Sequence, residues 1–537
     1  PWGTSSTRAA AERHHDLPAR AVLELAVGCG LLEWSGGTKG TWVDVATDEE
    51  VDEAHVAGRY REEVSSRCGI RRTEQSIKGE LRVFTERPVT LAVGSADDAR
   101  ALTEATPGAT AQSIDGAWTV TVPAGAALWA SHRVPLPRQV TAPIPDGMAP
   151  TAFGVPTEMA AAVDKIAAWN LATTAEAFRD AGTDPEELLV VVDASRVACT
   201  QGTGMGGMDS IRTIHLAPRR QVPHANDVLQ EALGNVVPAH AVQSFVGGAG
   251  PMIHPVAACA TAGVSLELAA DLVRAGKADV VVGGGFDDIG PEGVVGFAEM
   301  SATADDARLS DAGFTPREMS RPGDRSRAGF VESQGGGSFL VCRGSVAAEL
   351  GLPVRAVVVF ASSYGDGLQT SIPAPGPGAL GAVHGDAGSP LALALAAHGL
   401  TADDIRVVSK HDTSTRANDP NEASIHERIQ AALGRSAGNP LRVISQKSLT
   451  GRAKGGSALW QIAGLCDVFD DGVVPGNPNL DSVDPDVQDG PFLVLDDAPL
   501  KLQRPPRAAL FTSLGFGHVS VLGALAHPDV FTQALLA

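Results

Sequence analysis

The stretch PVAACATAGVSLELAADLVRAGKADVVVGGG, residues 255–285, decides the fold. Small apolar residues lead up to Cys259, apolar residues recur at helical spacing over 264–272, and the run at 278–282 is typical of a buried strand. A cysteine in the first turn of a buried helix lies near the positive end of the helix dipole, which favours the nucleophilic thiolate. Taken alone, however, the segment fits a small buried core cysteine better, so the motifs elsewhere in the chain must decide.

Composition excludes several classes of protein. The 537 residues carry 42 Lys and Arg against 63 Asp and Glu, a formal net charge of −21, which argues against nucleic-acid binding and against binding to anionic membranes. The six cysteines form no CxxC pair, so we predict no metal site and no disulfide framework, and a reducing, cytoplasmic setting fits best. No apolar run has membrane-spanning length. Because the chain begins at Pro1 rather than methionine, we expect a piece of a longer polypeptide.

A proline-rich connection, VPLPRQVTAPIPDG at 134–147, marks a predicted domain boundary near residue 145. Beyond it, helix and strand patterns alternate, beginning with a predicted helix at 159–180 and a predicted strand, LLVVVDAS, at 188–195. Alternation of this kind predicts an α/β domain with a largely parallel, buried sheet. We therefore divide the chain into an N-terminal region, 1–145, and a larger domain, 146–537.

The segment GTGMGGM at 202–208 contains a GxGxxG spacing, and a dinucleotide site is one interpretation. Such a site needs an acidic residue at the end of a second strand about twenty residues further on. The corresponding stretch has no strand before its acids. The sequence therefore favours glycines that let this loop pass close to another part of the backbone.

Two further segments place reactive side chains after predicted strands. HDTST at 411–415 follows the strand-like IRVVS, and a histidine in such a position suits acid/base or hydrogen-bonding work, although a structural histidine remains the alternative. QKSLTGRAKGG at 446–456 carries Lys447 at a strand end, where a solvated lysine is the alternative. The glycine-containing loops at 320–337 and 512–520 are ambiguous by themselves.

The order and spacing of these segments resemble the β-ketoacyl synthases, condensing enzymes of the thiolase fold, over about residues 150–537. ACATA at 258–262 is similar to the nucleophile elbow of that family. HDTST resembles its HGTGT loop, with Asp419 and Glu422 following His411 at the family's spacing. Three further matches are Lys447 as the start of the lysine motif, SRPGDRSRAGF (320–330) as SRPFDxxRDGF, and GFG (515–517) as the gating loop.

The segments most resemble the condensing domain of fungal and actinobacterial multifunctional type I fatty acid synthases, in which glutamine replaces a glutamate as Gln334 does here. The resemblance implies a thiolase-like layered αβαβα fold preceded by an α+β connecting region at 1–145. It implies a homodimer within a larger homo-oligomer, with an acyl-carrier domain and other fatty acid synthase domains as partners. It implies no bound metal or diffusible cofactor, because phosphopantetheine arrives on the carrier.

The resemblance also assigns roles in a β-ketoacyl-ACP synthase reaction. Cys259 would take the acyl chain as a thioester, and the enolate left by decarboxylation of malonyl-ACP would attack it. Backbone amides of Cys259 and Phe516 would form an oxyanion hole. Phe516 would also be a gate, with Gly515 and Gly517 beside it at the substrate.

The remaining assigned residues would act around the second substrate. His411 would hold the malonyl carbonyl and stabilise the enolate, and Lys447, paired with Glu422, would keep the geometry of its loop. Thr413 and Thr415 would order that loop and contact the pantetheine arm. Asp419 would support the loop.

One position departs from the family pattern. The family has a histidine in KSxxGH, and this chain has Arg452 in KSLTGR. A guanidinium only donates hydrogen bonds and keeps its charge, whereas an imidazole can also accept. The alternative function is therefore a domain impaired in condensation, which acts as a scaffold or loads acyl chains only. A degradative thiolase, the other enzymatic alternative, would need a second cysteine near the C-terminus, and none follows Cys466.

Overall fold

The computed structural model describes residues 19–36, 40–220, 227–367, 376–488 and 490–536. The chain forms two compact units, one of Pro1–Thr73 with Val140–Ala537 and one of Glu74–Gln139. The described residues before Glu74 thus belong to the same unit as the long C-terminal part. The division at residue 145 between a connecting region and a synthase domain stays a prediction.

A six-stranded sheet in the order β14-β21-β20-β15-β16-β18 forms one half of the larger unit. Its strands are β14 (Val357–Gly365), β15 (Ile405–Ser409), β16 (Leu441–Ile444), β18 (Leu493–Leu495), β20 (Ala508–Gly515) and β21 (Val519–Ala526). The four strands β20, β15, β16 and β18 run parallel, whereas β21 is antiparallel to both of its neighbours. Five of the six strands thus point the same way, as predicted for a largely parallel sheet, and only β21 is reversed, because a short turn returns the chain from β20 directly into it.

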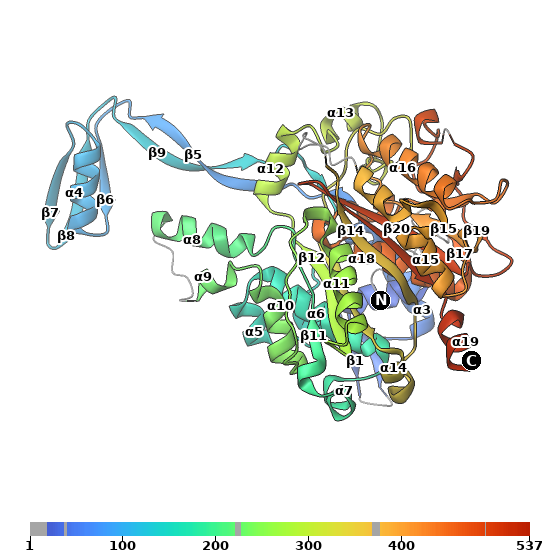
Figure 1. Ribbon diagram of the computed structural model, residues 1–537. Coiled ribbons are helices and arrows are strands. Elements are labelled where there is room, and N and C mark those ends of the chain that lie inside the picture. The colour runs from blue at the N-terminus through green and yellow to red at the C-terminus, as the bar shows by residue number, and fades with distance from the viewer. Residues whose placement is uncertain (1–18, 37–39, 221–226, 368–375, 489, 537) are drawn as a thin grey trace. The chain divides into compact units, whose positions relative to one another are not determined.

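A second, smaller sheet has the order β11-β12-β13, with β11 (Val197–Cys199), β12 (Val280–Asp287) and β13 (Gly335–Cys342). Two buried helices, α11 (Thr261–Arg274) and α18 (Ser457–Asp471), pack between the two sheets (Figure 1). Their apolar side chains meet those of both sheets in one core cluster. Burial on all sides explains why these helices are rich in Ala, Leu and Val.

Outer helices cover the remaining face of each sheet. Helix α6 (Lys165–Ala181) packs on the smaller sheet, and α15 (Pro390–Ala397) and α16 (Asn418–Ala432) pack on the larger one. The layers are thus helix, sheet, helix, sheet, helix. The predicted thiolase-like αβαβα fold is confirmed.

Further elements complete the larger unit. Its N-terminal part packs α2 (Ala19–Gly28) and α3 (Glu53–Arg67) beside the antiparallel strands β1 (Leu32–Ser35), β2 (Thr41–Asp44) and β3 (Glu50–Val51). The short strands β4 (Arg71–Arg72) and β10 (Val140–Thr141) pair antiparallel. The other elements are α5 (Thr157–Ala162), α7 (Pro185–Val191), α8 (Met208–Arg220), α9 (Val228–Glu231), α10 (Val236–His240), α12 (Pro291–Glu299), α13 (Asp306–Asp311), α14 (Gly344–Leu350), α17 (Lys447–Thr450), α19 (Asp529–Leu536), β17 (Val473–Val474) and β19 (Leu500–Lys501).

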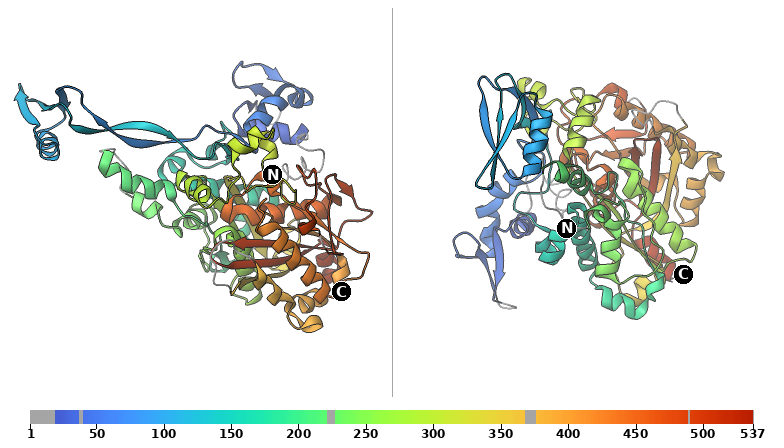
Figure 2. Two further views of the ribbon diagram at one scale, coloured as in Figure 1. Left: turned by 90° about the horizontal axis from the view of Figure 1, so that it is seen from above. Right: turned by 90° about the vertical axis from the view of Figure 1, so that its left-hand side faces the viewer.

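The smaller unit is an antiparallel ribbon that carries a small sheet. Strands β5 (Ser76–Phe84) and β9 (Ala127–Pro135) pair along nine residues each. Between them the chain forms the sheet β6-β8-β7, with α4 (Ala96–Ala105) against one face (Figure 2). The sheet strands are β6 (Val89–Val93), β7 (Thr110–Ile114) and β8 (Ala117–Val122).

Two local predictions are wrong. The first half of the run predicted as a strand at 188–195 lies in helix α7, because Asp184 and Glu187 form a capping box and Pro185 occupies the first helical turn. The helix predicted at 159–180 is two helices, α5 and α6, since Asp164 caps the start of the second one.

The GTGMGGM loop serves the packing of the fold. A Cβ atom on Gly202 would lie 2.4 Å from the carbonyl oxygen of Pro255. The buried Asp287 carboxylate accepts hydrogen bonds from the backbone N–H groups of Gly204 at 2.9 Å and Met205 at 3.1 Å, and from the hydroxyl of Thr203. Because an internal carboxylate takes the N–H groups that a phosphate would need, the structure favours the packing role over a dinucleotide site.

We predict that Asp287→Ala lowers the free energy of unfolding by at least about 3 kcal/mol, because it leaves buried N–H donors without an acceptor at about 1–3 kcal/mol each. Gly455 N–H also donates to this carboxylate, at 2.6 Å. Urea unfolding followed by circular dichroism measures the loss. The matched control is Asp288→Asn, which breaks only the contact to the half-exposed Lys165 and should change stability by less than about 1 kcal/mol. Equal effects of the two substitutions would contradict a stabilising role for the hydrogen bonds to Asp287.

Candidate active site

Cys259 lies in a tight turn, Ala258–Ala260, directly before helix α11. The hydroxyl of Thr261 holds the turn: it accepts from Ala257 N–H at 3.0 Å and donates to Ala258 O at 2.8 Å. Ala258 has a φ of +47°, a left-handed conformation that is costly for a residue with a Cβ. The structure therefore places the cysteine on a strained elbow at a helix N-terminus, as the ACATA motif predicts.

The end of strand β20 and the loop after it lie against this elbow. Ser513 Oγ donates to the carbonyl oxygen of Cys259 at 2.9 Å. A Cβ atom on Gly515 would lie 2.3 Å from Ala257 O, so only glycine allows this approach. Gly517 has a φ of +87° and forms the turn into β21. Phe516 is thereby held beside the cysteine elbow.

Two acidic side chains of helix α16 hold the backbone of the His411 loop. Glu422 accepts from the backbone N–H groups of His411 at 2.5 Å and Asp412 at 2.8 Å. Asp419 accepts from Thr413 N–H at 3.0 Å. Both acidic side chains are fully buried, and burial together with the nearby Asp412 raises the pKa of Asp419 to about 7. The predicted supporting role of these acids has a concrete form: they fix the path of the loop.

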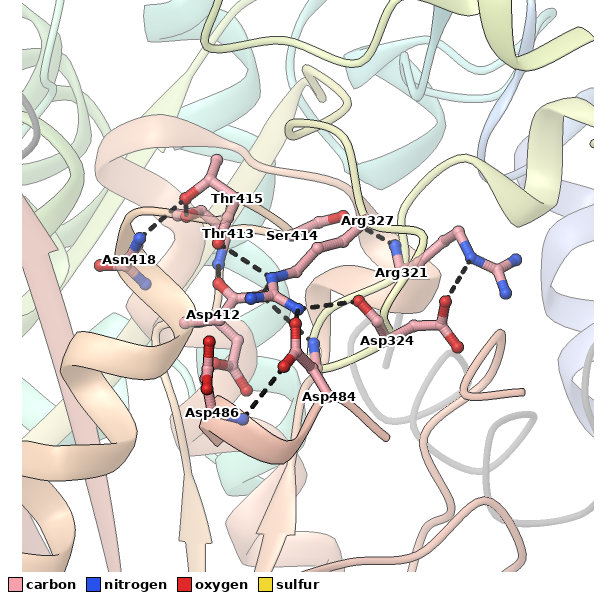
Figure 3. A network of polar contacts seen from close by, with 12 residues as sticks. Arg321, Asp324, Arg327, Asp412, Thr413, Ser414, Thr415, Asn418, Asp484 and Asp486 are labelled. Carbon is pink, nitrogen blue, oxygen red and sulfur yellow. Dashed lines mark hydrogen bonds and ion pairs between the residues drawn. The ribbon is translucent and has the colours of Figure 1, made fainter. Parts of the chain in front are cut away.

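The segment 320–330 holds the same loop from the other side (Figure 3). Arg321 N–H donates to Ser414 Oγ at 2.9 Å, and Gly329 N–H donates to Ser414 O at 2.9 Å. Arg327 Nε donates to Thr415 O at 3.2 Å, and its Nη1 contacts Asp484 at 2.6 Å. The similarity of this segment to SRPFDxxRDGF thus corresponds to a clamp on the histidine loop.

Lys447 fixes the tautomer of His411. Its Nζ lies 3.1 Å from His411 Nδ1 and also donates to the carbonyl oxygen of His411. Burial, Lys447 and Arg452 hold the pKa of His411 well below its usual range, so the ring is neutral near pH 7. Since Nδ1 accepts from the ammonium group, the ring proton lies on Nε2. His411 is therefore a neutral hydrogen-bond donor.

The partner of Lys447 differs from the sequence prediction. Lys447 contacts His411, whereas Glu422, its predicted partner, holds the loop backbone and accepts from the hydroxyl of Thr512. Burial and the nearby Arg452 lower the pKa of Lys447 to about 8, and Glu422 acts in the opposite direction. The lysine thus carries its proton at neutral pH by a small margin.

Arg452 contacts the thiol of Cys259 directly. Its Nη2 lies 2.7 Å from Cys259 Sγ, and the side chain is almost completely buried. Three rings surround the guanidinium, whose carbon lies 4.1 Å from the ring centre of Phe330, 4.8 Å from that of Phe516 and 5.7 Å from that of Phe297. Faces of aromatic rings attract a cation. The arginine at the family's histidine position therefore occupies a cage beside the thiol.

His411, Thr413, Thr415, Arg452 and Phe516 line one cavity of about 610 Å³. They come from the loops after β15, β16 and β20, whose parallel strands end at the same edge of the sheet. Five of the eleven residues predicted for the site thus line this cavity. Cys259 is not one of the lining residues; its Sγ contacts Arg452, which is.

Several residues at the site were not predicted as functional. Phe330 ends the quoted 320–330 segment, so its place in a motif was a usable signal, whereas nothing in the sequence marked Phe297. Lys410 and Asp412 form a fully buried ion pair of 2.8 Å. Asp412 has a φ of +25°, at the place of a glycine in the family's HGTGT.

Comparison with known proteins identifies the family. The N-terminal domain of β-ketoacyl synthases matches residues 114–347, and their C-terminal domain matches residues 355–481. The chain belongs to the β-ketoacyl synthase family. These enzymes are condensing acyltransferases.

The β-ketoacyl synthase has relatives among fungal fatty acid synthases. It is 35% identical to fatty acid synthase alpha subunit stcJ of Emericella nidulans over 100% of this chain and 35% of that one. It is 28% identical to fatty acid synthase subunit alpha of Saccharomyces cerevisiae over 100% of this chain and 34% of that one. Fatty acid synthase 2 of Mycosarcoma maydis is 32% identical over 98% of this chain and 15% of that one. The chain spans between 15% and 35% of the length of these relatives.

Solved structures share the fold of this synthase. The ketosynthase FabY from P. aeruginosa superposes with a TM-score of 0.82 over 96% of this chain and 81% of that one, at 20% identity. A β-ketoacyl synthase from Burkholderia phymatum has a TM-score of 0.62 over 73% of this chain and 89% of that one, at 19% identity. Among the residues that the structure describes, no cluster of His, Cys, Asp and Glu is arranged to hold a metal ion. None of the described helices is long and apolar enough to cross a membrane.

We predict an alkaline limit to the synthase activity near pH 8. Above the pKa of Lys447, which is about 8, the lysine loses the charge that orients His411, so kcat/KM for condensation should fall as pH rises. In Lys447→Arg the cation persists, because a guanidinium has a pKa above about 12. The pH at which kcat/KM falls to half should then rise by at least about one unit. A pH profile of ketoacyl formation measures it, and an unchanged midpoint in Lys447→Arg would assign the alkaline limit to another group.

Proposed function

We propose that this chain is the condensing domain of a fatty acid synthase and catalyses decarboxylative Claisen condensation of a malonyl group with an acyl chain on Cys259. The observation that carries the proposal is the shared cavity: it joins a neutral donor, His411, to a cation, Arg452, that contacts the thiol. Both substrates would arrive as thioesters of phosphopantetheine on an acyl-carrier domain.

In the first half-reaction the Cys259 sulfur attacks the acyl thioester carbonyl. The bond from the carbonyl carbon to the carrier sulfur breaks, and the carrier thiol leaves with the proton. The charge-assisted contact from Arg452 stabilises the sulfur anion before attack. The backbone N–H groups of Cys259 and Phe516 are the proposed donors to the oxyanion, supported by the close approach of the 513–517 segment to the elbow.

In the second half-reaction the bond between the malonyl carboxyl carbon and the α-carbon breaks, and carbon dioxide leaves. The electron pair stays on the α-carbon as an enolate, whose oxygen accepts from His411 Nε2–H. The α-carbon then attacks the acyl carbonyl, and Cys259 leaves as the thiolate beside Arg452. The cation that helps the sulfur anion to attack also helps it to leave.

The partners belong to the same proposal. The fungal relatives are fatty acid synthase subunits, which supports a carrier domain and other synthase domains as partners. Thr413 and Thr415, at 2.9 Å from each other on the cavity wall, are the proposed contacts of the pantetheine arm. We further propose a homodimer within a larger homo-oligomer and a cytoplasmic location.

The test is incubation with acyl- and malonyl-carrier protein while acyl-Cys259 and ketoacyl product are followed together by mass spectrometry. The parent chain should form both species, and Cys259→Ala neither. His411→Ala should keep acyl loading and lower condensation by about 10²–10³-fold, because it removes one donor to the enolate. Acyl-Cys259 without product in the parent, with product restored by Arg452→His, would contradict condensation and leave the acyl-loading alternative.

A further inference from the structure

The cavity is cationic although the protein is strongly acidic. The formal net charge is −21, yet the described residues that line the cavity include Arg308, Arg327, Arg416 and Arg452 and no Asp or Glu. Arg327 is neutralised by Asp484 at 2.6 Å. Arg308 and Arg416 are exposed, and Arg452 is buried at the inner end. A cavity of this kind favours ligands with a negative charge deep inside it.

Arg452 has hydrogen-bonding capacity that the protein leaves unused. Its Nη2 donates to Cys259 Sγ, but its buried Nε has no hydrogen-bond partner. The rings of Phe330 and Phe516 attract the cation but offer no strong acceptor. A buried N–H of a charged group is normally satisfied, and the open side of this cage is the cavity. The missing acceptor is therefore expected from a ligand.

The geometry points to a carboxylate-binding site at Arg452 that holds the free carboxylate of a carboxyacyl thioester, such as the malonyl group, before it reacts. This inference rests on the proposed function for the thioester arm but gives the arginine a task of its own. Nε and a remaining Nη hydrogen match the two oxygens of a carboxylate. An uncharged acyl thioester of the same arm lacks that group, so the site would select the carboxylated substrate.

The site has a kinetic consequence. As carbon dioxide leaves, the negative charge moves from the carboxylate to the enolate, so Arg452 binds the ground state more tightly than the transition state of this step. An interaction of that kind lowers both KM and kcat. In the decarboxylation step, followed by itself as release of carbon dioxide, Arg452→His should therefore raise both the KM for malonyl-carrier protein and kcat. A purely structural role would lower kcat in the variant and leave no reason for KM to rise with it.

The direct test needs no turnover. Calorimetry on the full chain compares a malonyl-pantetheine analogue, in which an amide nitrogen replaces the thioester sulfur, with its uncharged methyl ester. The parent should bind the acid about 10- to 100-fold more tightly than the ester, the range expected for a charge-assisted contact. Arg452→Gln should abolish the difference, and Arg452→Lys should restore part of it. Arg416→Gln, which removes an exposed cavity arginine, is the matched control and should keep it within about twofold.

Each outcome decides. Equal affinities for acid and ester in the parent, no binding of either, or a preference that survives in Arg452→Gln with an unchanged melting temperature would overturn the site. A preference for the acid in a chain that forms no ketoacyl product would keep the carboxylate site and reject condensation. Formation of ketoacyl product without a preference for the acid would keep condensation and reject the carboxylate site.

Discussion

The contact between the Arg452 guanidinium and Cys259 Sγ is the constraint to which the rest of the site adjusts. A guanidinium cannot give up its proton, so this charge is present at every relevant pH. Burial and the two cations Lys447 and Arg452 keep His411 neutral, and burial together with Arg452 lowers the pKa of Lys447 to about 8. Near neutral pH the buried centre therefore contains two cations and one neutral imidazole. That arrangement suits chemistry in which negative charge appears on sulfur and then on oxygen.

The acidic groups near the cavity face away from it and accept hydrogen bonds from the backbone. Glu422 and Asp419 are fully buried behind the His411 loop, where they accept from main-chain N–H groups. In the loop itself, Asp412 adopts a φ of +25° and pairs with Lys410, which offsets the cost of an additional buried carboxylate. The loop can thus expose a neutral donor and hydroxyl groups on its cavity side while all three carboxylates point elsewhere.

The sequence predicted what depends on local pattern and order. The helix after Cys259 and the strand that ends two residues before His411 follow from apolar spacing, whereas the elbow at Cys259 was predicted from the resemblance to the family. The prediction of a strand at 188–195 was wrong because a continuous apolar run fits either a helix or a strand. The capping box of Asp184 selects the helix. Phe297 could not be predicted at all, since α12 meets the site only through tertiary packing. Lys447 was placed correctly but paired wrongly, because spacing does not show which side chain reaches which atom.

The accommodation of an arginine at position 452 follows from its surroundings. Hydrogen bonds to Val331 and Ser333 on both sides of the residue fix its backbone next to the segment that ends in Phe330. A planar cation can therefore lie against Phe330 and Phe516 without moving the main chain. The same fixed backbone limits the reach of a shorter side chain, so a histidine here would approach Cys259 with one ring nitrogen instead of a fork of donors. The consequence of arginine is thus added binding capacity toward anions within an unchanged fold.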